Sequence, residues 1–199
     1  MFAPHPGDIN IQDQHGDVVV DANDRKSYSP YPTFTYSFGL HMGWKAFDLS
    51  VFLQGVAGLH SFVYGWGWEP FVQGDPPLAM FEKAWSPTNP SNTIPAVYIG
   101  SGSYTGGYGG VKAYQSTYEL QNASYMRIKS IRLAYTISRR MIDRIKSKGI
   151  SVYISGDNLF TFTKYPATDP ERAMTGPNGG RAFYYPQVRT LNAGLDVKF

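Results

Sequence analysis

The chain has 199 residues, and only 17% of them are charged, against roughly 25% in a typical soluble domain. A net charge of +3 is too small to argue for nucleic acid, and the lack of cysteine excludes disulfides, cysteine zinc sites and iron–sulfur clusters. The mean hydropathy of −0.30 and the lack of any long apolar run exclude a transmembrane helix, although not strands that cross a membrane.

Residues 33–54 predict a long β-hairpin. Apolar and polar residues alternate without a break from Thr33 to Trp44, and the alternation resumes at Phe47 after a short turn at 44–46. Residues 59–123 break this pattern with glycine, proline and aromatic residues. They predict a loop that is unusually long for a compact domain.

Three more strands are predicted further along the chain. Residues 124–137 form the third, with a change of phase near Ser130 that indicates a β-bulge. A short basic helix over 138–148 precedes the fourth strand at 150–163. The fifth strand runs over 188–199, after a loop rich in glycine and proline.

The lengths of the strands and of their connections indicate a membrane barrel. The strands reach about 10 to 14 residues, close to what a tilted strand needs to cross a bilayer. Short connections at 44–46 and 138–149 alternate with long ones, as in outer-membrane barrels with short periplasmic turns and long outer loops. Five strands cannot close a barrel, so the chain is expected to be a fragment.

Several motifs share their order and spacing with one known family. They are residues 6–9, 47–55, 85–90, 124–129, 155–165, 169–171 and 185–190. Together they resemble the C-terminal part of SusC/RagA-type TonB-dependent outer-membrane transporters of Bacteroidetes, and the resemblance covers nearly the whole chain. It implies an all-β fold, with about five C-terminal antiparallel strands of a large plugged transmembrane barrel.

The resemblance also implies a division of the chain and a set of partners. Residues 1–32 would be an extracellular Asp-rich loop, and 33–199 would be barrel strands with outer loops at 59–123 and 164–187. The expected partners are a SusD-like surface lipoprotein, the TonB complex through the missing N-terminal part, the barrel-assembly machinery, the outer-membrane bilayer and a glycan or peptide solute. No nucleic acid is expected.

An acidic loop over residues 13–24 has the spacing of a calcium-type loop. Carboxylates occupy positions 1, 5, 9 and 12 of a twelve-residue frame, and a main-chain carbonyl supplies a further oxygen. These candidate metal ligands are Asp13, Asp17, Val19, Asp21 and Asp24. His15 and Val18 depart from the pattern, and a hydrogen-bonded loop without metal is the alternative. No other cofactor is expected.

Two further groups of residues are candidates for binding and assembly. Aromatic rings in the long loop can stack on sugar faces, or can instead pack the loop onto a partner or onto itself: Trp66, Trp68, Trp85 and Tyr104. The last strand ends in a pattern that resembles a barrel-assembly signal, with an ordinary amphipathic strand as the alternative: Asn192, Gly194, Val197 and Phe199.

Polar strand residues are expected to face the barrel lumen: Thr35, Ser37, His41, Asp48, Gln54, Arg127 and Lys129. The basic segment 139–148 either touches anionic phosphate groups or is a solvated turn, and the second interpretation is favoured. The histidines lack metalloprotease spacing, and neither a nucleophile elbow nor a phosphate-binding loop occurs. Catalysis therefore has little support in the sequence, and the family resemblance implies import of oligosaccharides or peptides instead.

Two other functions remain open at this stage. A soluble carbohydrate-binding β-sandwich would bury the same alternating face against a second sheet. An outer-membrane receptor or adhesin without transport would share the barrel but lack a transport role.

Overall fold

The computed structural model describes residues 5–64, 82–97, 116–142, 147–172, 180–181 and 185–198. The chain divides into two compact units. We call the first the sheet unit, which contains Pro32–Gly58, Ser124–Lys164 and Pro186–Phe199. We call the second the loop unit, which contains Met1–Tyr31, Leu59–Ala123 and Tyr165–Tyr185.

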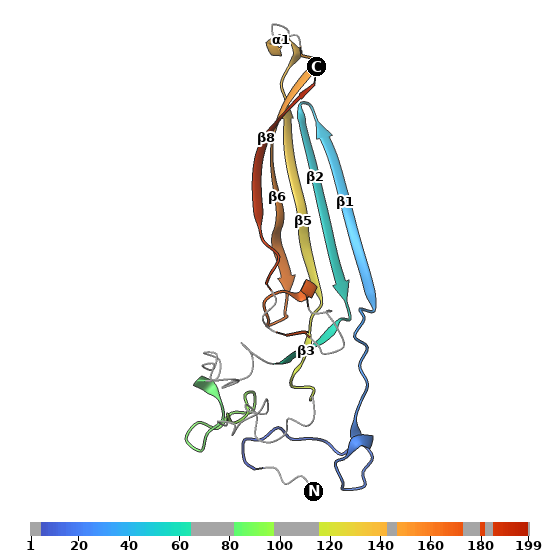
Figure 1. The fold of residues 1–199 in the computed structure, drawn as a ribbon, viewed down its shortest axis with the longest axis vertical. Coiled ribbons are helices and arrows are strands. Elements are labelled where there is room, and N and C mark those ends of the chain that lie inside the picture. Colours follow the sequence, from blue (N-terminus) through green and yellow to red (C-terminus); the bar gives the residue numbers. More distant parts are fainter. Residues whose placement is uncertain are drawn as a thin grey trace. The chain divides into compact units, whose positions relative to one another are not determined.

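The sheet unit is built on five long antiparallel strands, as the sequence predicts (Figure 1). They lie in the order β1 (Phe34–Trp44), β2 (Phe47–Ala57), β5 (Tyr125–Thr136), β6 (Gly149–Thr163) and β8 (Thr190–Lys198). Each of these five strands therefore pairs with the one that follows it along the chain. The short helix α1 (Arg139–Ile142) follows β5 at the end of the sheet where β8 also ends.

The first hairpin has a two-residue turn. Trp44 pairs with Phe47, and Lys45 and Ala46 connect them. Lys45 has a φ of 54°, a left-handed conformation that residues with a side chain rarely adopt. The turn is short enough to fix the register of β1 with β2 over all eleven pairs.

A β-bulge in β5 confirms the phase change that the sequence indicates near Ser130. Ile128 pairs with Leu53 and Ser130 pairs with Phe52, so Lys129 has no counterpart on β2. If β5 continued through Lys129 with regular alternation and no bulge, Ile131 and the apolar residues after it would point to the opposite face from Ile128, because side chains alternate along a strand. The bulge therefore keeps the apolar residues of both halves of β5 on one face.

The loop unit contains short strands that the sequence analysis missed. They are β3 (His60–Tyr64), β4 (Leu120–Asn122) and β7 (Gly180–Arg181), with β3 antiparallel to β4 and parallel to β7. Short turns of 3₁₀-helix also occur there, among them η1 (Ala22–Asp24) and η6 (Pro170–Arg172). These strands lie within the long loops that the sequence predicts, and at two to five residues they are too short to show an alternation.

The core of the loop unit contains Leu59 and Val63, which are fully buried, together with Ala96, Ala123 and Tyr165. Burial raises the pKa of the Tyr165 hydroxyl, and its hydrogen bond with Ser61 opposes that rise. In the part of the chain that the structure describes, no helix has the length and apolar character that crossing a bilayer requires.

Candidate functional site

The five-stranded sheet of the sheet unit has one entirely apolar face. The register sorts onto it Phe34, Tyr36, Phe38, Leu40, Met42 and Trp44 of β1, Phe47, Leu49, Val51, Leu53, Gly55 and Ala57 of β2, Met126, Ile128, Ile131, Leu133 and Tyr135 of β5, Ile150, Val152, Ile154, Gly156, Phe160 and Phe162 of β6, and Leu191, Ala193, Leu195 and Val197 of β8. None of these paired residues is charged.

Many side chains of this apolar face are exposed. The exposed fraction is 57% for Phe38, 61% for Ile154 and 78% for Leu191, on three different strands. Contiguous apolar surface of this extent is rare on soluble proteins and indicates contact with lipid or another apolar partner. The face thus has the composition of a membrane-facing barrel wall.

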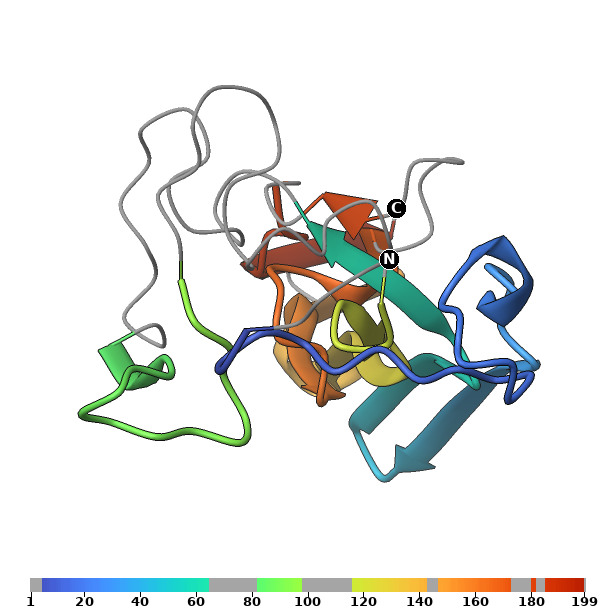
Figure 2. The ribbon, with the colours of Figure 1, turned by 90° about the horizontal axis from the view of Figure 1, so that it is seen from below.

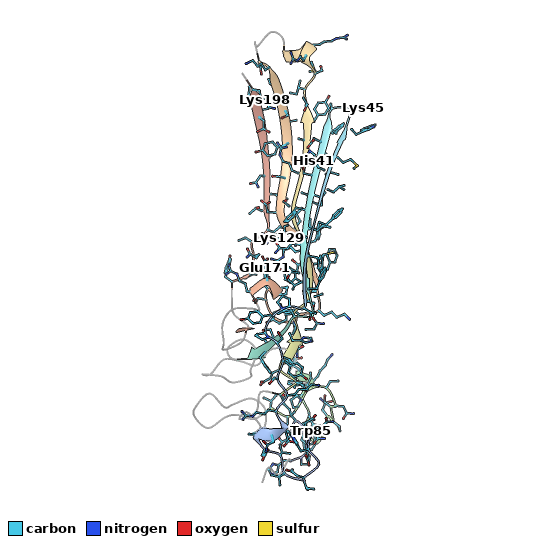
Figure 3. The ribbon with its side chains drawn as sticks, turned by 90° about the vertical axis from the view of Figure 1, so that its right-hand side faces the viewer. His41, Lys45, Trp85, Lys129, Glu171 and Lys198 are labelled. Atoms are coloured by element: carbon cyan, nitrogen blue, oxygen red, sulfur yellow. The ribbon has the colours of Figure 1, made fainter. Side chains whose placement is uncertain are left out.

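The opposite, polar face carries paired polar and charged side chains. On β1 and β2, the His41 Nδ1 atom lies 2.7 Å from Ser50 Oγ, and its Nε2 atom lies 3.3 Å from Asp48 Oδ2. In Figure 3, His41 lies between Lys45, which is at one end of the strands, and Lys129. These contacts satisfy both ring nitrogens of His41 from the neighbouring strand.

A second cluster on the polar face joins β5, β6 and β8. Arg132 Nη2 donates to Asp196 Oδ2 at 2.6 Å, and the guanidinium carbon of Arg132 lies 4.3 Å from the ring centroid of Tyr153. The Arg132–Asp196 pair is partly exposed and contributes at most about 1 kcal/mol. The Tyr153 ring lies across Gly194, the residue with which it pairs on β8.

Arg127 is a buried cation on the polar face of β5. Its side chain has only 3% relative exposure, and its Nε atom donates to Thr161 Oγ1 on β6 at 2.7 Å. Its guanidinium carbon also lies 5.7 Å from the ring centroid of Tyr125. A buried cation needs such partners because desolvation penalises an isolated charge.

The register agrees with the predicted grouping of polar residues. Thr35, Ser37, His41, Asp48, Gln54 and Arg127 all fall on the polar face, while Lys129 occupies the bulge and has no partner position on β2. Sequence reasoning missed the cluster of Arg132, Tyr153 and Asp196. Each lies on the polar phase of its strand, but no sequence signal states which residues pair across β6.

The acidic loop 13–24 is held by hydrogen bonds to its own carboxylates. Asp13 accepts the N–H groups of His15, Gly16 and Val18, and Asp24 accepts those of Gln14 and Asp21. The segment closes on itself at η1, the blue coil in Figure 2. Among the described residues, no group of three or more His, Cys, Asp or Glu side chains is arranged to hold a metal ion.

The remaining candidate ligands of this loop also make short local contacts. Asp17 accepts from Val19 N at 2.9 Å, and Asp21 caps η1 by accepting from Asn23 N at 2.7 Å. Val18, where the calcium-type pattern has glycine, has a φ of 67°. These contacts are those of the hydrogen-bonded alternative, and calcium at this loop stays a prediction.

Trp85 packs inside the loop unit. Its indole lies so close to Gly7 that a Cβ at Gly7 would approach the ring carbon Cδ2 to 2.7 Å. Gly7 O accepts from Ala96 N at 2.8 Å, and Trp85 N donates to Ile94 O at 3.0 Å. Trp85, labelled in Figure 3, thus helps pack the loop onto itself. Trp66, Trp68 and Tyr104 lie outside the described residues, so sugar stacking stays a prediction.

The residues of the predicted assembly signal divide between the two faces. Asn192 and Gly194 lie on the polar face of β8, Val197 lies on the apolar face, and Phe199 lies outside the described residues. Gly194 has a structural reason of its own, since the Tyr153 ring occupies the space of a side chain there. Recognition by the assembly machinery stays a prediction.

A sheet of long antiparallel strands, with one apolar face and one charged face, defines this chain as part of the wall of a transmembrane β-barrel. No protein-family model matches the sequence. Curated relatives do match it over almost its whole length. TonB-dependent receptor P3 of Formosa agariphila is 29% identical over 98% of this chain, and TonB-dependent receptor SusC of Bacteroides thetaiotaomicron is 28% identical over 94%.

Solved structures show the same fold. The RagAB peptide importer in its open-open state superposes with a TM-score of 0.68 and 24% identity, covering 95% of this chain and 20% of that chain. Its closed-closed state gives a TM-score of 0.63 at 24% identity, covering 92% and 20%. The chain spans 19% of receptor P3 and 17% of SusC, and thus about a fifth of the proteins it matches.

Over nearly its whole length the chain is therefore similar to TonB-dependent receptors of the SusC/RagA type, as the sequence motifs indicate. Its fold class is the one that the sequence predicts, a set of about five antiparallel strands of a large transmembrane barrel.

Proposed function

We propose that this chain forms five neighbouring strands in the barrel wall of a TonB-dependent outer-membrane transporter. The uninterrupted apolar face across all five strands carries this proposal. A sheet buried in lipid on one side and in a polar interior on the other needs this division of side chains. The names of the curated relatives and the importer among the similar structures support transport.

We further propose that the complete transporter imports oligosaccharides or peptides together with a SusD-like surface lipoprotein. SusC among the relatives and the RagAB peptide importer among the similar structures support this solute class and pairing. In this arrangement the loop unit is extracellular and the polar face of the sheet lines the lumen or contacts a plug. The chemistry is binding and passage without bond-breaking.

The exposed apolar face favours the barrel over the soluble β-sandwich. In a sandwich, the inner face of each sheet is covered by a second sheet and its side chains are buried. Here, residues in the middle of β1, β6 and β8 keep more than half of their surface exposed. No feature of the described residues favours an adhesin over a transporter, and the experiments below separate the two.

Cysteine accessibility in isolated outer membranes tests the barrel wall. Single cysteines at Phe38 and Leu191 on the apolar face are compared with matched cysteines at their strand neighbours Ser37 and Asn192. We expect brominated lipid to quench a fluorophore at Phe38 and Leu191, and a water-soluble thiol reagent to label Ser37 and Asn192. Equal labelling at both members of each pair contradicts the proposal.

The apparent mass of the native polypeptide and the proteins that copurify with it test the proposed transporter function. An antibody against residues 188–199 should detect a band several times larger than 22.2 kDa in outer membranes. A surface lipoprotein should copurify with it, and deletion of its gene should abolish uptake of a labelled oligosaccharide or peptide. A band of 22.2 kDa in the soluble fraction contradicts the proposal, and a membrane band without any uptake indicates an adhesin.

A further inference from the structure

One end of the sheet unit collects five exposed cationic side chains. They are Lys45 in the β1–β2 turn, Arg139 and Arg140 in α1, Lys148 before β6, and Lys198 at the end of β8. The backbone joins two of these segments, since Lys148 N donates to Lys198 O at 2.7 Å. Figure 1 shows α1 and the C-terminus at this end, and Figure 3 places Lys45 and Lys198 there.

The acidic residues that the structure describes near this end contact other groups. Asp48 contacts His41 on the polar face, and Asp196 pairs with Arg132. None of the five cationic side chains forms an ion pair with an acidic residue in the described parts of the chain. This basic end, defined by these five residues, is therefore available to an anionic partner.

An aromatic row lies on the apolar face beside the basic end. The Trp44 and Phe47 ring centroids are 6.3 Å apart, and those of Phe47 and Tyr135 are 5.0 Å apart. The Lys45 ammonium lies 4.7 Å from the Trp44 ring centroid, which links the row to the basic end. Trp and Tyr prefer the level of the lipid headgroups, where their rings meet both acyl chains and water.

We propose that the basic end binds the phosphate groups of anionic phospholipid headgroups in the leaflet at this end of the barrel. The inference rests on the proposed membrane-wall function. Lys45 stands directly beyond an apolar face and beside an interfacial ring, where a headgroup phosphate would lie. A soluble anion accounts for the charge but not for the aromatic row next to it.

The test measures lipid preference at two sites on β1 of the complete protein in reconstituted bilayers. A bimane fluorophore is attached to a cysteine at Met42, beside the basic end, or at Phe34, at the far end of the same strand. Quenching by brominated phosphatidylglycerol is compared with quenching by brominated phosphatidylcholine, which carries no net charge. The variant K45Q/R139Q/R140Q removes three charges from the basic end, and K26Q/K83Q/K164Q removes three exposed charges elsewhere as a matched control.

At Met42 we expect a preference for phosphatidylglycerol that falls at least about threefold in the first triple variant, since one Lys or Arg near an anionic surface contributes roughly fivefold to binding. The preference at Met42 should persist in the control variant, and the preference at Phe34 should not respond to K45Q/R139Q/R140Q. An unchanged preference at Met42, or an equal loss in the control variant, overturns the proposal. If neither brominated lipid quenched the fluorophore at Met42 or at Phe34, the membrane-wall function itself would be refuted.

Discussion

At the scale of single residues, the Asp13 carboxylate organises the acidic loop. It accepts three backbone N–H groups, at 3.0 Å from His15 and at 2.6 Å from both Gly16 and Val18. Each bond favours the charged carboxylate, so together they hold the pKa of Asp13 below its usual 3.8. The N–H groups of Asp21 and Gln14 lower the pKa of Asp24 in the same way.

Because both pKa values are lowered on folding, the loop should lose stability as the pH falls. The stabilisation is complete above the ordinary carboxyl pKa of 3.8 and is lost as the pH falls through the lower values of the folded loop. We expect hydrogen exchange at Gly16 and Val18, corrected for the intrinsic rate, to accelerate below pH 3.8. Asp13→Ala should show this faster exchange already at neutral pH. Protection that persists through the acid range would contradict the assignment.

Asn158 combines a special backbone conformation with a side-chain hydrogen bond. Its φ of 53° lies in the left-handed region, which asparagine tolerates better than most residues. Its Nδ2 atom donates to Val188 O at 3.1 Å, which ties β6 to the segment before β8. The residue lies where the pairing of β6 with β5 shifts by one position.

Two substitutions at Asn158 separate these roles. Asn158→Ala should lower the free energy of unfolding by about 1–3 kcal/mol, because it loses the hydrogen bond and places an unsuited residue in the left-handed region. Asn158→Gly loses only the hydrogen bond and should recover about 1 kcal/mol of that loss. Denaturant unfolding in detergent measures both values. Equal destabilisation by the two variants would show that the backbone conformation is unimportant.

At the scale of the strands, glycine and tyrosine pair across neighbours on both faces of the sheet. Tyr153 lies over Gly194 on the polar face, and Tyr36 lies over Gly55 on the apolar face. The Tyr36 hydroxyl also donates to Tyr125 O at 3.4 Å. In each pair the ring covers backbone that glycine leaves bare, which compensates for the weak strand preference of glycine.

Gly194→Ala should therefore destabilise the folded sheet, although it adds only one methyl group. The added Cβ would lie 2.5 Å from Tyr153 Cζ, so the ring must move and Arg132 loses the aromatic surface beneath it. We expect a loss of about 1–3 kcal/mol in the free energy of unfolding. Asn192→Ala, on the same strand and face, is the matched control and should cost less. The reverse order of the two losses would refute the packing role of Gly194.

Whole strands were predictable where the alternation is long. Residues 33–44 and 47–54 show it clearly, and the bulge in β5 was visible as a change of phase near Ser130. The cluster of Arg132, Tyr153 and Asp196 was not predictable, since it depends on the register of β5, β6 and β8. Register depends on turn geometry and on bulges in neighbouring strands, which a single strand sequence does not contain.

At the scale of the whole molecule, the two faces of the sheet should respond in opposite ways to charge. Phe38→Arg places a cation on the apolar face near the middle of β1, and Ser37→Arg places it on the polar face. An arginine facing lipid at the bilayer midplane costs about 2–4 kcal/mol. We expect Phe38→Arg to lower the folded fraction, seen as the heat-modifiable band in gel electrophoresis, and Ser37→Arg to leave it nearly unchanged. Similar losses for both variants would contradict the assignment of faces.

The pairing of β2 with β5 leaves the excursion between these two strands free to change in length and composition. Val56 pairs with Tyr125 where the chain leaves β2 and enters β5, and in the loop unit Ala123 N donates to Leu59 O at 2.9 Å. The excursion over residues 60–122 is thus closed at its base by hydrogen bonds. Its length and composition can change without altering the pairing of β2 with β5. In the transporter that we propose, this excursion would therefore be free to vary in sequence while the wall stays the same, as recognition loops vary on other rigid scaffolds.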